Sequence, residues 1–209
     1  MRYLSPALVL MAPLMLPVPT AHAIPMTFVA HLTEANEVPP TGSPATGLAT
    51  VILDPTAQTI QINATFSGLS TPDTMAHIHC CLASPFLPGV NVGVATTVPA
   101  FPGFPLGVTS GTYTSAVFDL TQPLIYNPAF VTLQGGTIAG AEAALIAGIE
   151  NGETYFNIHT MAFPGGEERD FLAFLVPVPE PASLVLLGSA VVGFWLMGRR
   201  RKSTAPAGG

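Results

Sequence analysis

The chain has 209 residues, a length that allows one ordinary domain together with its targeting segments. Between its two apolar ends, residues 24–176 hold eleven acidic side chains and a single basic one, Arg169, so this part has a net charge near −10 with neutral histidines. Such a charge repels nucleic acid, and it excludes nucleic-acid binding from the functions to be considered.

Residues 1–23 predict a signal peptide that is cleaved after export. Arg2 precedes an apolar stretch too short to span a bilayer comfortably, and the segment ends in AHA at 21–23, the small-x-small pattern that signal peptidase recognises. Four prolines argue against the alternative, a buried N-terminal helix. We therefore expect export by the Sec machinery, cleavage by signal peptidase and a mature chain that begins near Ile24.

The segment 24–176 is predicted to be an all-β domain. Its apolar and polar residues alternate with period two in seven segments, with an eighth over 90–98, and turn residues such as Asp54-Pro55 separate them. The seven are 26–32, 47–54, 59–66, 75–79, 111–120, 153–160 and 169–176. This spacing favours an antiparallel β-sandwich or barrel of about 7–8 strands.

Two segments depart from this alternation. Residues 137–152 are rich in alanine, have helical spacing and end near Gly152, which predicts one short helix over an open end of the sandwich. Residues 98–107 are rich in proline and glycine, which predicts an ordered loop packed by its own Phe101 and Phe104.

The histidines of the domain lie on the polar faces of their predicted strands. Side chains two apart on a strand share a face, so His77 and His79 point the same way, opposite the apolar row of their strand. His159 and His31 likewise lie opposite the apolar rows of theirs. We therefore expect these histidines to lie outside the core.

Two histidines at i and i+2 can direct both imidazole rings at one metal ion, and a third from a neighbouring strand completes a facial set. His77, His79 and His159 are therefore candidate ligands for copper or zinc. The side chains that could join them are His31, Glu34, Glu37 and Glu167. The alternative interpretation is a set of solvated surface histidines that form hydrogen bonds across strands.

Cys80 and Cys81 are the only cysteines of the chain, and the predicted compartment is oxidising. Three states are open: a disulfide between these neighbours, an intermolecular bridge, or thiolate ligation beside the histidines at a copper site. We favour the vicinal disulfide because two exported thiols rarely stay reduced.

The sequence predicts no catalytic residues. It contains no serine nucleophile elbow, glycine-rich phosphate loop or HExxH motif. Glu167 and Glu168 are neighbours on a predicted strand, so they point to opposite faces and cannot flank one bond.

The C-terminal residues 177–202 form a three-part pattern, followed by a predicted disordered tail over 203–209. Pro-Glu-Pro at 179–181 precedes 17 uncharged residues, and a basic cluster begins at Arg199. An apolar helix followed by such a cluster stops in the membrane with the cluster on the cytoplasmic side. The residues that carry the pattern are Pro179, Glu180, Pro181, Arg199, Arg200 and Arg201.

This pattern resembles the PEP-CTERM sorting signal of Gram-negative bacteria. The resemblance implies a transmembrane helix that a membrane protease of the exosortase type removes after recognising Pro-Glu-Pro. A plain C-terminal membrane anchor is the alternative interpretation.

Four blocks of the domain resemble, in order, those of the CHRD domain, which was named for chordin and is widespread in exported bacterial proteins. The blocks are FVAHLTEANEVPP at 28–40, ATGLATVILD at 45–54, AHIH at 76–79 and YFNIHTMAFPGGEERDFL at 155–172. The resemblance covers about residues 27–175 and implies an immunoglobulin-like or similar β-sandwich with no established catalytic activity. It assigns a structural motif to Glu37, Pro39, Pro40, Asn157, Gly165, Gly166, Glu167 and Arg169.

The last block departs from the usual family pattern, GGEIRG, because Glu168 and Asp170 flank Arg169. As the single base of the domain, Arg169 is expected to pair with Glu37 or Glu167 and to tie distant segments together.

The sequence as a whole predicts an exported, non-catalytic CHRD protein, anchored in the inner membrane as a precursor and then displayed at the surface or released. Extracellular polysaccharide or matrix proteins are its candidate partners. The alternative is a periplasmic or extracellular copper- or zinc-binding protein.

Overall fold

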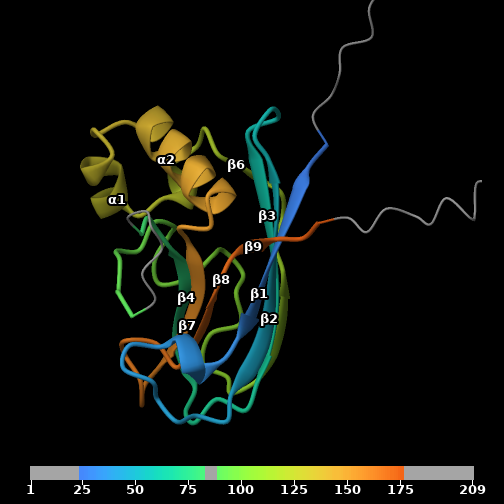
Figure 1. The fold of residues 1–209 in the computed structure, drawn as a ribbon, viewed down its shortest axis with the longest axis vertical. Coiled ribbons are helices and arrows are strands. Elements are labelled where there is room, and N and C mark those ends of the chain that lie inside the picture. The colour runs from blue at the N-terminus through green and yellow to red at the C-terminus, as the bar shows by residue number, and fades with distance from the viewer. Residues whose placement is uncertain (1–23, 83–88, 177–209) are drawn as a thin grey trace, which may run out of the picture. The chain divides into compact units, whose positions relative to one another are not determined.

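A computed structural model describes residues 24–82 and 89–176 of the chain (Figure 1). The chain divides into two compact units, Met1–Phe174 and Leu175–Gly209, and all elements named below belong to the first. Within the described ranges no helix has the length and apolarity that a membrane crossing requires. The predicted signal peptide and C-terminal transmembrane helix lie outside these ranges.

The larger sheet is antiparallel and has the order β5-β3-β2-β1-β9, with β6 also paired to β3 (Figure 1). Its strands are β1 (Met26–Leu32), β2 (Thr46–Asp54), β3 (Thr59–Ser67), β5 (Gly111–Thr114), β6 (Phe118–Asp119) and β9 (Ala173–Phe174). The register places Phe28, Val51 and Ile62 side by side, and all three are buried. This sheet therefore buries one apolar face, as its period-two sequence predicts.

The smaller sheet is antiparallel, with the order β4-β7-β8. Its strands are β4 (Asp73–His79), β7 (Tyr155–Thr160) and β8 (Glu168–Phe171). The side chains of Ala76, Ile78, Phe156 and Ile158 form its inner face and belong to the same apolar core as the larger sheet. The two sheets thus form the expected two-layer β-sandwich, while an immunoglobulin-like strand order stays a prediction.

The described residues of the domain also include four helical segments: η1 (Glu34–Asn36), η2 (Pro123–Ile125), α1 (Pro128–Leu133) and α2 (Ile138–Glu150). The predicted helix over 137–152 is confirmed as α2, which begins where the Thr137 side chain accepts a hydrogen bond from Gly140 N–H. Both α-helices lie together at one end of the sandwich (Figure 1). Leu145 and Ile149 of α2 pack into the core there.

The strand predicted over 90–98 is wrong. This segment forms only isolated bridges, between Val94 and His79 and between Thr96 and Tyr126. Part of its contact with β4 comes from a side chain, because Thr96 Oγ1 accepts the hydrogen bond of Ile78 N–H at 2.9 Å. The alternating residues of 90–98 therefore lie along β4 without forming a continuous series of backbone hydrogen bonds with it.

Two other predicted strands are broken. The segment 111–120 divides into β5 and β6, because the Ser115 hydroxyl accepts from Ile62 N–H and interrupts the backbone pairing with β3. The segment 169–176 divides into β8 and β9, which belong to different sheets. The predicted ordered loop over 98–107 is present, with Phe101 and Phe104 buried in the core.

The number of acidic side chains suggested a strongly negative surface, but not all of them lie on the surface. Five of them are buried: Glu37, Asp73, Glu142, Glu167 and Glu168. The surface is therefore less negative than the composition implies.

Candidate metal centre

The outer face of the smaller sheet carries the histidines. In the register of β4 and β7, His77 lies opposite Asn157, His79 lies opposite Tyr155, and His159 lies opposite Met75. These neighbours have side chains on the same face, because residues directly opposite in an antiparallel pair point the same way. The sequence alternation thus brings three imidazole rings together from two strands.

The expectation that these histidines lie outside the core is only half right. They are opposite the apolar layer, but His77, His79 and His159 are only 1%, 7% and 4% exposed. Loop residues cover the outer face, as the hydrogen bonds of the rings to Val92, Pro99 and Pro164 show. Long-range loops, which strand alternation does not reveal, therefore bury the polar face.

Each ring is held by a backbone carbonyl at Nδ1. The Nδ1 atoms lie 3.3 Å from the Pro99 oxygen for His77, 2.7 Å from the Val92 oxygen for His79 and 2.9 Å from the Pro164 oxygen for His159. A carbonyl oxygen only accepts, so each Nδ1 of a neutral ring carries the hydrogen and each Nε2 carries a lone pair.

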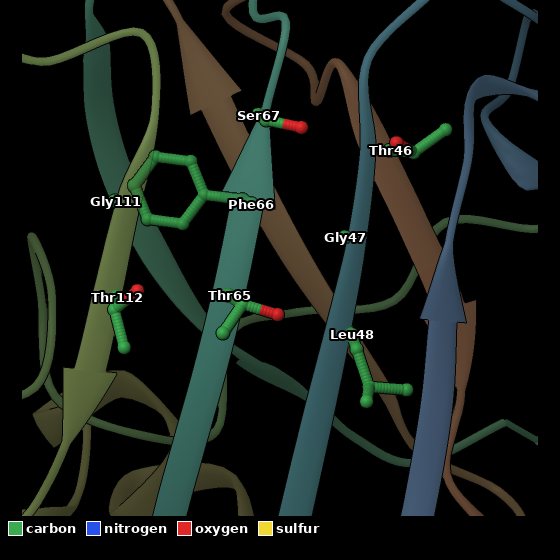
Figure 2. Close-up of a pocket in the computed structure, with 8 residues that line it drawn as sticks. All are labelled: Thr46, Gly47, Leu48, Thr65, Phe66, Ser67, Gly111 and Thr112. Carbon is green, nitrogen blue, oxygen red and sulfur yellow. The ribbon is translucent and has the colours of Figure 1, made fainter.

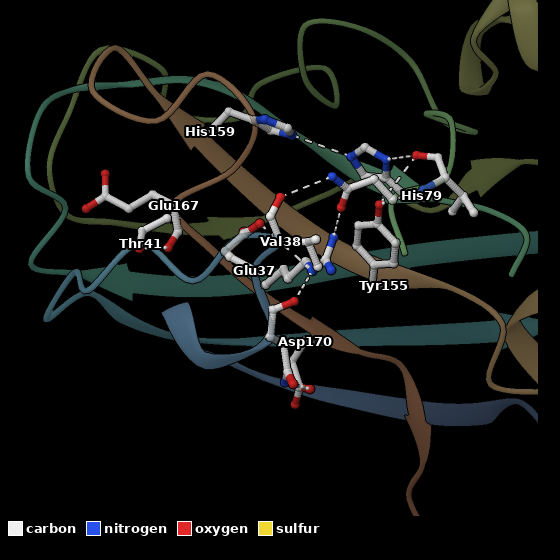
Figure 3. Close-up of polar contacts among 12 residues, drawn as sticks. Glu37, Val38, Thr41, His79, Tyr155, His159, Glu167 and Asp170 are labelled. Atoms are coloured by element: carbon white, nitrogen blue, oxygen red, sulfur yellow. Dashed lines mark hydrogen bonds and ion pairs between the residues drawn. The ribbon is translucent and has the colours of Figure 1, made fainter. Parts of the chain in front are cut away.

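The three Nε2 lone pairs converge. His79 Nε2 and His159 Nε2 are 3.5 Å apart and face each other in Figure 3, and His77 Nε2 is buried without a partner. The ligand atoms of the three rings lie within 4.8 Å of one another. Two nitrogens bonded to one ion at about 2.0–2.1 Å lie at most about 4.2 Å apart, a condition that the 3.5 Å between His79 Nε2 and His159 Nε2 meets.

The rings are held in the neutral form. Burial, and then the neighbouring His159 and His79, lower the pKa of His77 to about 2. Burial also lowers the pKa of His79 to about 4, although its hydrogen bond to Val92 opposes this shift, and burial lowers the pKa of His159. Neutral rings keep the Nε2 lone pairs available, which is the state that binds a metal.

The other predicted ligands do not join this cluster. His31 is exposed on β1, and Glu34 accepts a hydrogen bond from Gly42 N–H at 3.1 Å. Glu167 accepts from the hydroxyls of Ser43, Ser70 and Thr160 and from Ser70 N–H, at 2.5–2.7 Å. Burial alone would raise the pKa of Glu167, but these hydrogen bonds hold it below its ordinary value.

The cysteines have a different environment. Cys80 and Cys81 form the vicinal disulfide that we favoured, and it packs against α2, where Ala144 O lies 3.5 Å from the Cys81 sulfur. A Cβ added at Gly148 would lie 2.5 Å from the Cys80 sulfur, so the helix approaches the disulfide closely at a glycine. Because the two sulfur atoms are bonded to each other, neither is available as the thiolate that copper–thiolate ligation requires.

Arg169 forms a buried polar network beside the histidines. Its side chain is 0% exposed, its Nε donates to Asn36 O and lies 3.9 Å from Glu37 Oε2, and its Nη1 donates to Asn91 Oδ1 at 2.6 Å. Its Cζ lies 4.5 Å from the centre of the Tyr155 ring, which also stacks on His79 at 4.6 Å. Arg169 therefore ties the 34–38 segment to β8, and of the two expected partners Glu37 is the carboxylate beside it.

A family model of the CHRD domain matches residues 28–169. The chain belongs to the CHRD domain family. A model of the PEP-CTERM protein-sorting motif matches residues 177–202 of this CHRD protein, which supports export and sorting by an exosortase-type system. No curated protein and no solved structure matches the chain.

Two clefts of the CHRD domain adjoin the Arg169 network. One of about 270 Å³ lies between residues 37–41 and 162–166, and it includes Pro164, whose carbonyl holds His159. Another of about 330 Å³ is lined by residues 35–38, Pro40, Gly89 and Phe171. Glu37 lines both clefts, so the Glu-Val-Pro-Pro segment separates two openings near the buried polar face.

A third cleft crosses β2, β3 and β5 on the larger sheet (Figure 2). Its lining residues are Thr46, Gly47, Leu48, Thr65, Phe66, Ser67, Gly111 and Thr112. None of them is acidic, basic or a histidine, so this cleft offers hydroxyl and apolar contacts alone. The three histidines of the cluster and Arg169 lie on the other sheet.

Sequence reasoning missed the burial of Glu168 and the contacts of the Tyr155 ring with His79 and Arg169. Glu168 is 0% exposed, and neither of its carboxyl oxygens has a hydrogen-bond partner. Burial, and then the nearby Glu167 and Glu37, raise its pKa to about 8. The departure from GGEIRG pointed to this position, but only strand pairing shows that it faces inward.

Proposed function

We propose that this exported CHRD protein binds one copper or zinc ion through Nε2 of His77, His79 and His159. The observation that carries the proposal is the convergence of three buried Nε2 atoms whose Nδ1 atoms are all held by backbone carbonyls. Metal-binding histidines commonly have their second nitrogen fixed in this way, because it sets the tautomer and the ring orientation.

Without an ion, this arrangement is costly. Each buried polar atom that lacks a hydrogen bond destabilises a folded protein by about 1–3 kcal/mol. Two lone pairs that face each other cannot form a hydrogen bond, so the cluster of His79 and His159 gains nothing from its proximity in the neutral state. A cation at the centre converts this repulsion into three bonds.

The ligand types select the class of metal. Three imidazole nitrogens suit zinc, copper and related transition ions, whereas calcium and magnesium prefer oxygen. The disulfide excludes thiolate ligands at Cys80 and Cys81, which disfavours a copper–thiolate centre. We therefore propose zinc or copper, bound by nitrogen alone on the protein side.

Processing of the precursor is part of the proposal. Signal peptidase would remove residues 1–23, and an exosortase-type protease would cleave at Pro179-Glu180-Pro181 and release the domain from its predicted membrane helix. The PEP-CTERM match over 177–202 supports this second step. The metal centre would then act at the cell surface or outside the cell.

The test is a metal titration of the full chain, exported to a periplasm, purified in detergent and stripped with a chelator. We expect one zinc or copper ion per chain, measured by elemental mass spectrometry, and a loss of this ion in His79→Gln and His159→Gln. His31→Gln is the matched control, because His31 is exposed on β1. Absence of stoichiometric metal in the unsubstituted protein would refute the proposal and leave a displayed module with a polar interior.

A further inference from the structure

The buried atoms without hydrogen bonds gather beside the proposed metal. In the described part of the chain, eight buried side-chain atoms have no partner, and four of them belong to His77, Asn157, Glu37 and Arg169. These four are His77 Nε2, Asn157 Oδ1, Glu37 Oε1 and Arg169 Nη2. A metal ion bound to the histidines would satisfy only the first.

These residues are neighbours in space. The register of the smaller sheet places His77, Asn157 and Arg169 directly opposite one another in a row across β4, β7 and β8. Glu37 joins the row from the loop, because its Oε2 lies 3.9 Å from Arg169 Nε. A Cβ added at Gly166 would lie 2.5 Å from Glu37 Oε1 and 2.7 Å from Asn157 Oδ1, so these two oxygens are also close together.

The charges of this group favour an anion. A divalent ion on three neutral rings keeps two positive charges, and Arg169 adds a third. Against these stands at most one negative charge from Glu37, because burial raises the pKa of that carboxyl to about 7. Arg169 has one free donor, and Asn157 and Glu37 have free oxygens that accept a hydrogen. Hydroxide on the metal meets most of these needs, since its oxygen accepts from Arg169 and its one hydrogen is donated to either Glu37 or Asn157.

We propose that the fourth position of the metal takes an exchangeable small monoanion, with hydroxide the smallest, held by Arg169 Nη2. This inference rests on the proposed three-histidine centre. The anion must be small because the side chains around it are buried and Gly166 already leaves no room for a methyl group. The clefts on either side of residues 37–40 are the candidate openings to it.

The experiment loads the full chain with Cu(II) and titrates it with azide, a linear monoanion of three atoms. We expect a saturable azide-to-copper charge-transfer band, with acetate, which is bulkier, producing no change at the same concentration. Loss of the Arg169 charge in Arg169→Gln should weaken azide binding at least about tenfold, which corresponds to about 1.4 kcal/mol. Glu37→Gln should instead tighten azide binding, because it removes the negative charge and keeps the size of the side chain.

Opposite effects of the two substitutions are the diagnostic result. A purely structural role of this network would lower azide affinity in both variants or leave both unchanged, and either result would overturn the inference. If Arg169→Gln does not fold, Glu37→Gln alone decides by the sign of its effect. Metal content is measured in each sample: copper without azide binding overturns only the anion site, whereas absence of copper overturns the proposed function with it.

Discussion

His79 and His159 direct their Nε2 atoms at each other across 3.5 Å, while the Nδ1 atom of each donates to a carbonyl oxygen. Neither Nε2 has a hydrogen to share, so this short separation is not a hydrogen bond between neutral rings. Protonation of one ring would supply a hydrogen, but burial lowers the pKa of both. A metal ion would bind the lone pairs of both Nε2 atoms, so no proton would be needed between them.

Removal of the metal should lower the stability of the domain. A ligand present at 100 times its dissociation constant adds about 2.7 kcal/mol to the free energy of unfolding. For a domain of this size that corresponds to a Tm about 5–10 °C higher than in the presence of a chelator. The measurement is thermal unfolding with zinc or with a chelator.

The control for this prediction is His77→Gln/His159→Gln, whose Tm should be independent of zinc and chelator. Equal Tm values for the unsubstituted protein under both conditions would contradict a bound ion.

Tyr155→Phe should weaken metal binding while the domain stays folded. The Tyr155 ring stacks on His79, and its hydroxyl accepts from Val92 N–H at 3.2 Å, the residue whose carbonyl holds His79 Nδ1. Phenylalanine keeps the ring but releases Val92, and loss of such outer contacts typically reduces metal affinity about 10–100-fold. The measurement is zinc affinity by competition with a chromophoric chelator.

Tyr113→Phe is the matched control for Tyr155→Phe. Tyr113 lies on β5 of the other sheet, where its hydroxyl donates to Pro102 O at 2.9 Å. Tyr113→Phe removes the bond to Pro102, and Tyr155→Phe removes the two bonds between its hydroxyl and Val92, so each substitution should cost about 1–2 kcal/mol of stability. Only Tyr155→Phe should change zinc affinity, and equal affinities in the two variants would show that the Val92 contact does not position His79.

Glu168→Gln should flatten the dependence of stability on pH. Because burial raises the pKa of Glu168 to about 8, the folded protein retains a proton that the unfolded chain loses near pH 4.5. Its contribution to stability is therefore complete below about pH 4.5 and falls as pH rises towards about 8. Glutamine has no proton to lose, so the variant should gain at least about 1 kcal/mol relative to the unsubstituted protein between pH 5 and pH 8.

The measurement is denaturant unfolding at both pH values. Two neighbouring carboxylates, those of Glu167 and Glu37, also raise the pKa of Glu168. Both remain in the variant, so their effect is common to the two proteins. An unchanged pH profile in Glu168→Gln would mean that this carboxyl ionises normally in the folded protein.

Gly148→Ala should destabilise the domain although alanine favours helices. The added Cβ would lie 2.5 Å from the Cys80 sulfur and 2.8 Å from the Cys81 sulfur, and such overpacking typically costs about 1–3 kcal/mol. Placing the same substitution in a Cys80→Ala/Cys81→Ala background should remove the cost and leave the helix gain of about 1 kcal/mol. Equal effects in the two backgrounds would show that the helix does not contact the disulfide.

The site could be predicted from the sequence where it depends on strand alternation. Period two assigns His77, His79 and His159 to polar faces, and pairing of β4 with β7 makes these faces continuous. Their burial could not be predicted, because Val92, Pro99 and Pro164 reach the rings from separate loops. Loop closure over a sheet leaves no periodic pattern in the sequence.

The errors in the fold have a similar cause. Residues 90–98 alternate like a strand, but Thr96 uses its side chain to pair with Ile78, which alternation cannot reveal. Opposite faces for Glu167 and Glu168 could be derived from their spacing, yet which of them points inward depends on the pairing of Glu168 with Ile158. Local patterns therefore located the elements, and long-range pairing decided what each side chain contacts.

X-ray absorption spectroscopy of the zinc-loaded full chain tests the metal centre most directly. The account predicts one zinc ion with three imidazole nitrogens at about 2.0–2.1 Å and one further light-atom ligand. The imidazole signal should fall in His79→Gln and stay unchanged in His31→Gln. A spectrum with only oxygen ligands, or one unaffected by His79→Gln, would contradict binding by His77, His79 and His159.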